Sequence, residues 1–325
     1  MTRSKGSKAV GDPPKEAIAI VSTVFLLGIY HLPSVLSRLD EIAQTPDIIA
    51  QPLFPEIISK FTLAYIRLSI SLFFALVTLY RSFMVKHSII IPYLKSSKLK
   101  RVPISLNGIR SQIPFTQWCF NLLTISFLLN GLITLQFAHQ ESGSSIDFLQ
   151  PLVQKDWIRI AILLFEISAP CSMLVSSVTK YVLWPNSLKN GTKGSVNFRK
   201  PVALIQHNCN IFVSLLEVGL LGILPIRIED AVIAPLYGSI YVFFVWSIRN
   251  HLAETGDTQY VYFFLDTTIS IKFCVQALIG LLSVLLLFYG AFTLVDDVLL
   301  WLDGNIFMHL FLTLAATSFF CRFRD

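Results

Sequence analysis

The stretch VALIQHNCNIFVSLLEVGLLGIL, residues 202–224, decides the fold class of this chain. Leu, Ile, Val and Phe fill most of its positions, and its length is close to the ~20 residues that cross a bilayer as a helix. The polar residues inside it include His207, Asn210, Ser214 and Glu217. Their spacing of 3, 4 and 3 places them on one face of a helix. The stretch therefore predicts a membrane helix that carries a polar stripe.

This polar stripe has two interpretations. Ionisable side chains inside a bilayer are costly, and they normally face a partner or a wet cavity. A histidine and a glutamate on one stripe therefore indicate a polar site inside a helix bundle. Asn and Ser also join membrane helices through hydrogen bonds, so contact between helices is the competing interpretation.

The composition extends the membrane assignment to the whole chain. The 325 residues are 54% hydrophobic and only 14% charged, with a mean hydropathy of +0.65, whereas about a quarter of a soluble domain is charged. The net charge of +6 does not indicate nucleic acid, because the basic residues lie in short segments between apolar spans. We expect an integral membrane protein without a nucleic-acid partner.

Eight apolar spans can be drawn, and the need to satisfy the backbone in lipid makes them helices. They cover 16–36, 57–80, 114–136, 157–183, 202–225, 231–250, 271–295 and 304–321. The last span is the shortest. We expect an all-α polytopic transmembrane helix bundle of about eight spans, forming a single domain over 1–325.

The connections between the spans differ in positive charge. The N-terminal tail, which includes Arg3, Lys5 and Lys8, and the second and fourth connections are rich in Lys and Arg, whereas the first and third are poor. Cytosolic loops are enriched in these residues, so we expect both termini and the fourth connection in the cytosol. Asn190 begins a glycosylation sequon in the fourth connection, which should then stay unmodified.

This topology brings Thr116 and His207 to a similar depth. Thr116 lies in the first turn of the third span and His207 one to two turns into the fifth, and both spans enter from the cytosolic side. At ~1.5 Å per residue both lie within roughly 10 Å of that interface. His207 could act as the base for a threonine nucleophile, and Asn210 could orient it or stabilise an oxyanion. A capping role at the helix start is the competing interpretation of Thr116.

Two carboxyl groups lie deeper. Glu217 and, from the other side, Glu166 approach the middle of the bilayer, and Pro170 should kink the helix that carries Glu166. If the two carboxyls are neighbours, at least one should hold a proton, because two buried carboxylates cannot both ionise cheaply. An ordinary helix kink without function is an equally simple interpretation of Pro170.

Motifs for metal and cofactor chemistry are missing from the sequence. It has no Gly-x-Ser-x-Gly elbow, no His-Glu-x-x-His, no P-loop and no Rossmann fingerprint. No two histidines stand four residues apart, and the five cysteines lie in or beside apolar spans without metal-ligand spacing. We expect free thiols, no metal and no cofactor.

Four short strings are similar to the androgen-induced family of multipass membrane hydrolases, which cleave fatty acid esters of hydroxy fatty acids. The strings are Phe115-Thr116-Gln117-Trp118, Tyr181-Val182-Leu183-Trp184 after the Pro170 helix, His207-Asn208-Cys209-Asn210 with Glu217 following, and Tyr260-Val261-Tyr262-Phe263-Phe264-Leu265-Asp266. The likeness covers roughly residues 110–295. Phe263 stands where the family has Pro, and the family has about six spans, so the first two spans and the last one have no counterpart.

The resemblance implies a threonine hydrolase, with Thr116 as the nucleophile and His207 as its base. Asn210, Ser214, Glu217 and Glu166 would support the site. The partner would be a membrane lipid or lipid ester, and we expect the endoplasmic reticulum or another endomembrane rather than the plasma membrane.

Two other functions remain open at this point. A non-enzymatic lipid-binding or receptor-like protein could use the same cavity without turnover. A proton-coupled transporter could use Glu166 and Glu217 as proton sites, although no inverted repeat or pair of broken helices at matching positions supports it.

Overall fold

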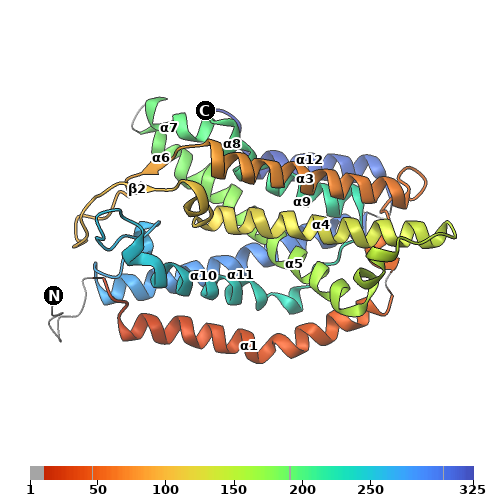
Figure 1. Cartoon of the computed structure of the whole chain (residues 1–325), viewed down its shortest axis with the longest axis horizontal. Helices are drawn as coiled ribbons and strands as arrows, with labels where there is room; N and C mark the ends of the chain where they lie inside the picture. Colours follow the sequence, from red (N-terminus) through yellow and green to blue (C-terminus); the bar gives the residue numbers. More distant parts are fainter. Residues whose placement is uncertain (1–10, 46, 190–191, 303) are drawn as a thin grey trace.

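The computed structural model describes residues 11–45, 47–189, 192–302 and 304–325 and is an all-α bundle (Figure 1). Seven helical segments are long and apolar enough to cross a membrane: Lys15–Ala43, Lys60–Met84, Phe115–Glu141, Lys155–Leu188, Pro201–Leu221, Ile228–His251 and Ile271–Trp301. The shorter apolar helix α12 (Ile306–Phe320) follows them. The expected polytopic bundle is confirmed.

The long segments divide into the following labelled elements. The main helices are α1 (Lys15–Ala43), α3 (Lys60–Met84), α4 (Phe115–Glu141), α5 (Lys155–Val178), α9 (Asn210–Leu216), α10 (Ile233–Ile248) and α11 (Ile271–Trp301). Shorter helices are α2 (Asp47–Ala50), α6 (Trp184–Leu188), α7 (Thr192–Arg199) and α8 (Pro201–Leu204). Tight 3₁₀ turns are η1 (Gly108–Gln112), η2 (Asp147–Val153), η6 (Ile228–Asp230), η7 (Arg249–His251) and η8 (Phe263–Leu265). Wider π turns are η3 (Thr179–Leu183), η4 (Ile205–Cys209) and η5 (Glu217–Leu221), and a two-stranded antiparallel ribbon pairs β1 (Ser88–Ile89) with β2 (Ile104–Ser105).

Successive membrane helices run in alternating directions, so the start of α1 and the end of α12 lie toward the same end of the bundle (Figure 1). At this end, which we call the basic end, the Tyr260 hydroxyl donates to the carbonyl of Gly11, and Arg199 pairs with the C-terminal Asp325. At the opposite end Lys60 pairs with Glu141, and Arg38 pairs with Asp230. This arrangement agrees with eight alternating passes. Arg3, Lys5, Lys8 and Asn190, used above for the topology, lie outside the described residues.

The first helix is longer than its apolar span predicts. It runs through Pro33 and ends at Ala43 rather than near residue 36. The added turns carry Asp40, which forms ion pairs with Lys155 and Arg159 at the opposite end. The buried side chains of Leu39 and Ile42 and these ion pairs together keep the chain helical beyond its predicted apolar span.

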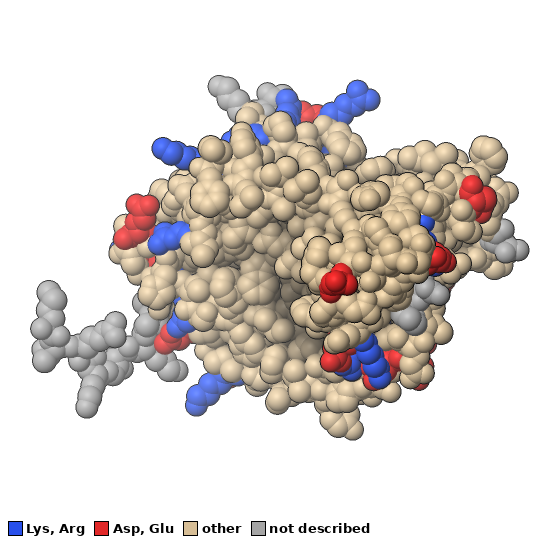
Figure 2. Space-filling view, turned by 45° about the vertical axis from the view of Figure 1, so that its right-hand side comes forward, with Lys and Arg blue, Asp and Glu red and all other residues tan. Residues whose placement is uncertain are grey.

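The outer surface suits a lipid environment. Most of the face in Figure 2 carries neither basic nor acidic side chains, and the charged residues gather toward its margins. Large apolar side chains are exposed on the membrane helices, among them Leu26 on α1, Leu76 on α3, Leu287 on α11 and Phe311 on α12. Burying these side chains in acyl chains removes the cost of exposing them to water.

The helix α4 packs against α3 and α5. Gly131 allows α3 to come close, because a Cβ atom there would stand 2.9 Å from the Leu68 side chain. Nearer the start of α4, Gln117 accepts a hydrogen bond from Gln206 of the segment 201–221.

Two connections form a cap over the basic end. We use this name for the second connection, residues 85–114, and the sixth, residues 252–270. Tyr93 joins them: its hydroxyl accepts the amide N–H of Tyr260 at 2.8 Å, and an isolated β-bridge pairs Ile104 with Ala253. Burial raises the pKa of Tyr93 to about 12, so this phenol stays protonated and holds the cap at neutral pH.

The orientation gives a testable prediction. With the basic end in the cytosol, Asn190 should remain unmodified when the chain is expressed in a eukaryotic host, because glycosylation takes place on the lumenal side. A sequon engineered between Ser142 and Ser145, in the third connection at the opposite end, should be glycosylated and should shift the mobility of the chain on a gel. Modification of Asn190 instead would reverse the orientation.

Candidate functional site

The polar stripe faces the bundle, as predicted from its spacing. Asn210, Ser214 and Glu217 are fully buried, and His207 is half-buried. The Nδ1 atom of His207 lies 3.0 Å from the Thr179 hydroxyl at the end of α5. The stripe is therefore enclosed by protein rather than turned to lipid.

A matching stripe on α5 meets it. Ser176 donates to the backbone carbonyl of His207 and to Oδ1 of Asn210, the latter at 3.2 Å, and Ser172 lies 3.2 Å from Ser214. These serine contacts hold the two helices together, which is the interhelical contact that the competing interpretation expected. Asn210 contacts Ser176 and not the imidazole, so its side chain does not orient His207 here.

Both sides of this contact contain π turns. Thr179 begins η3, His207 lies in η4 and Glu217 begins η5. A π turn widens the helix by one residue, shifts the side chains that follow and is common at functional sites. Here two of the three turns bring the Thr179 hydroxyl and the His207 ring together.

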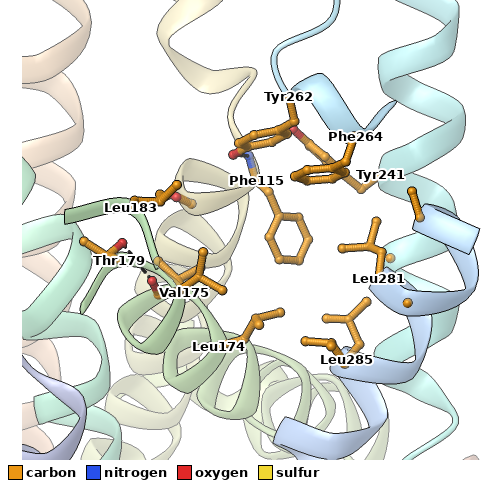
Figure 3. Close-up of a pocket in the computed structure, with 16 residues that line it drawn as sticks. Phe115, Leu174, Val175, Thr179, Leu183, Tyr241, Tyr262, Phe264, Leu281 and Leu285 are labelled. Carbon is orange, nitrogen blue, oxygen red and sulfur yellow. Dashed lines mark hydrogen bonds between the residues drawn. The ribbon is translucent and has the colours of Figure 1, made fainter. Parts of the chain in front are cut away.

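An apolar cavity of about 300 Å³ lies on the other side of Thr179. Figure 3 shows Tyr262 and Phe264 covering one side of it, the Phe115 ring pointing into it, and leucines of α5 and α11 opposite. The rings of Tyr262 and Phe264 are stacked, with centroids 5.2 Å apart. The cavity has the chemistry of an acyl-chain site, because nearly all of its lining is aliphatic or aromatic.

Thr116 lines this cavity beside Tyr262. The Tyr262 hydroxyl accepts the amide N–H of Phe115 at 3.1 Å, which holds it beside Thr116 in the cavity wall. Burial raises the pKa of Tyr262, so the phenol is protonated at neutral pH and can act as a donor. The cap thus brings a donor to the predicted nucleophile.

The two predicted catalytic residues lie on different sides of one region. Thr116 and Thr179 both line the apolar cavity. His207 does not line it and bonds to Thr179 from the side that faces away from the cavity. The hydrogen bond recorded for the imidazole of His207 goes to Thr179, not to Thr116. The structure therefore adds a second hydroxyl that sequence reasoning did not single out.

Arg81, near the end of α3, also reaches the region around His207 and Tyr262. Its guanidinium donates to the side-chain oxygen of Gln206, whose amide donates in turn to Gln117 on α4. Arg81 is also close enough to both Tyr262 and His207 to interact with them electrostatically. Among the described residues no carboxylate pairs with it, so a mostly buried cation remains without a counter-charge.

A second cavity, of about 320 Å³, opens at the basic end beside the first. Arg81, His87, Lys200 and His207 line it together with several apolar side chains. His207 and Thr179 lie in the wall between the two cavities.

The predicted supporting carboxyls have separate surroundings. Glu217 pairs with Arg67 of α3, whose Nε lies 3.2 Å from both of its oxygens, and neither side chain is exposed. Glu217 is also closer to the opposite end than the sequence implied, because the helical segment ends at Leu221. Glu166 is buried near Arg227 and Asp230 at the opposite end, without a side-chain hydrogen-bond partner among the described residues. The two carboxyls therefore do not form a pair.

Sequence reasoning missed two features for which signals existed and a third for which there was none. Arg67 is an ionisable residue inside the apolar span 57–80, and such a residue points to a buried partner. Ser172, Ser176 and Thr179 repeat at helical spacing on the fourth span. The approach of Arg81 to His207 had no local signal, because it depends on how α3 packs.

In the described part of the chain, no group of three or more His, Cys, Asp or Glu side chains could hold a metal ion, and all five cysteines are free. No family model, curated protein or solved structure matches the chain. The likeness to the androgen-induced family therefore rests on the quoted residues alone.

Proposed function

We propose that this protein is an intramembrane hydrolase of lipid esters, with a threonine nucleophile and His207 as its base. One observation carries the proposal: an apolar cavity ends at threonine hydroxyls, and one of these is hydrogen-bonded to a half-buried imidazole. A lipid ester would lie with its acyl chain in the cavity and its carbonyl at this polar end. The resemblance to the androgen-induced family favours the same chemistry in an endomembrane.

In this proposal the Thr116 oxygen attacks the ester carbonyl and His207 accepts its proton. The alcohol leaves with a proton, giving an acyl-threonine intermediate, and water then releases the fatty acid. Hydrogen bonds at catalytic sites often tighten only when substrate is bound, and the proposal requires His207 to reach Thr116 in the loaded site. Tyr262 and Arg81 lie where they could stabilise the negative charge that develops on the carbonyl oxygen.

The other polar residues of the stripe have supporting roles. Asn210 and Ser214 fix the stripe against α5. Glu217 holds α3 through Arg67 and does not act on substrate.

The proposal is tested by incubating the purified protein with a panel of lipid esters. Thr116→Ala should abolish turnover and labelling by a fluorophosphonate probe, because it removes the attacking oxygen. Thr124→Ala is the matched control: it lies on the same helix, and its hydroxyl bonds only to the carbonyl of Phe120 in its own helix. This control should keep wild-type turnover.

A third variant, Thr179→Val, separates the two hydroxyls. If Thr116 is the nucleophile, Thr179→Val should retain labelling at Thr116. Loss of labelling in Thr179→Val with full labelling in Thr116→Ala would transfer the nucleophile to Thr179. Intact ester bound by the wild type without any product would favour the lipid-binding alternative instead.

A further inference from the structure

The second cavity is lined by basic side chains from three separate segments. Arg81 comes from the end of α3, His87 from the cap and Lys200 from the residue before α8. No Asp or Glu occurs among the described residues that line it. Segments far apart in the sequence thus bring basic groups to one concave site.

The positive charge of this site is not balanced within the described protein. Arg81 is mostly buried and bonds to the neutral amide of Gln206, although buried charges are normally paired. Burial lowers the pKa of His87, and the neighbouring positive charges of Arg81 and Lys200 lower it further. An anion in the cavity would remove this repulsion.

The two cavities share a wall. Thr179 lines the apolar cavity and bonds to His207, which lines the basic one. Arg81 lines the basic cavity and interacts with Tyr262, which covers the apolar one. A single amphiphile can therefore place its chain on one side and its head group on the other.

We propose that the basic cavity binds the phosphate group of a lipid whose acyl chain lies in the adjacent apolar cavity. A phosphate group carries about −1.5 to −2 charges and three strong acceptor oxygens, which suits converging donors from Arg81 and Lys200 better than one carboxylate does. Arg and Lys are the side chains that commonly bind phosphate. The 320 Å³ of space leaves room for a glycerol unit beside the phosphate.

This inference deepens the proposed function by naming the head group of the substrate, and its test measures binding so that the two can fail separately. The full-length Thr116→Ala protein, which cannot turn over its ligand under the proposed mechanism, is placed in nanodiscs of neutral lipid. Three probes are compared at equilibrium: lysophosphatidate, a monoacylglycerol with the same chain, and soluble glycerol 3-phosphate.

We expect lysophosphatidate to bind at least about tenfold more tightly than either other probe, since it alone fills both cavities. Lys200→Gln, at an exposed position that cannot unfold the bundle, should weaken lysophosphatidate binding roughly three- to tenfold and leave the monoacylglycerol unaffected. Lys189→Gln is the matched control, an exposed lysine at the same end that does not line the cavity, and should change nothing. Arg81→Gln should abolish the preference for phosphate, and Arg81→Lys should restore part of it.

Three results would overturn the inference. Equal affinity for lysophosphatidate and monoacylglycerol would mean that the cavity ignores phosphate. Equal losses in Lys200→Gln and Lys189→Gln would show that general surface charge attracts the lipid. Glycerol 3-phosphate binding as tightly as lysophosphatidate would assign the site to a soluble phosphate rather than a lipid.

Discussion

His207→Ala should lower the rate of ester hydrolysis by about 10²–10⁴-fold, the usual contribution of a general base. Without the imidazole, the threonine oxygen must lose its proton to water, which is a much weaker base. Combining His207→Ala with Thr116→Ala should cause little further loss, because a nucleophile and its base act as one unit. The measurement is the initial rate of fatty acid release from the best ester of the panel, with each variant purified in the same detergent.

A histidine at the opposite end gives the control. His139→Ala removes a half-buried imidazole that bonds to Ser144, far from both cavities along α4, and should keep the wild-type rate. In His207→Ala the Thr179 hydroxyl still donates to the carbonyl of Val175 at 2.9 Å, so the bundle should fold. Unchanged turnover in a folded His207→Ala would make His207 a structural residue that joins η3 to η4.

The sequence predicts the bundle well because membrane helices can be identified from their apolar composition. The span 202–225 and its stripe were identified from apolar length and from polar spacing, both of which are local properties. The helix ends were less predictable, as at Ala43, where buried Leu39 and Ile42 and the ion pairs of Asp40 extend the helix beyond the apolar span.

The candidate site was harder to predict because it depends on which helices meet. The stripe alone shows that His207 needs a partner. Thr116 was chosen because it was expected at a similar depth in the membrane. The partner in the structure is Thr179. This residue begins η3, where the wider turn approaches η4 and His207. Likewise, Arg81 reaches the site through the packing of α3 against α4, a long-range contact that no local pattern in the sequence encodes.

Glu217→Ala should destabilise the bundle by about 3–5 kcal/mol, the usual cost of leaving one partner of a buried ion pair alone. Arg67 donates to Glu217, to the Ile49 carbonyl and to the Thr134 hydroxyl, and none of its side chain is exposed. Removing the carboxylate would leave the guanidinium charged and buried. The measurement is the midpoint of denaturant unfolding in a mild detergent.

Removing both charges together should be much less harmful. The double variant Arg67→Met with Glu217→Leu removes both charges of this pair, so most of the lost stability should return. The hydrogen bonds that Arg67 gave to Ile49 and Thr134 would still be lost. Glu217→Gln should keep measurable hydrolysis, because Glu217 lies ten residues, ~15 Å along the helix, from His207. If the double variant were as unstable as Glu217→Ala, the pair would not be the cause of the loss. If Glu217→Gln lost all turnover while staying folded, the carboxylate would belong to the chemistry rather than to the support of α3.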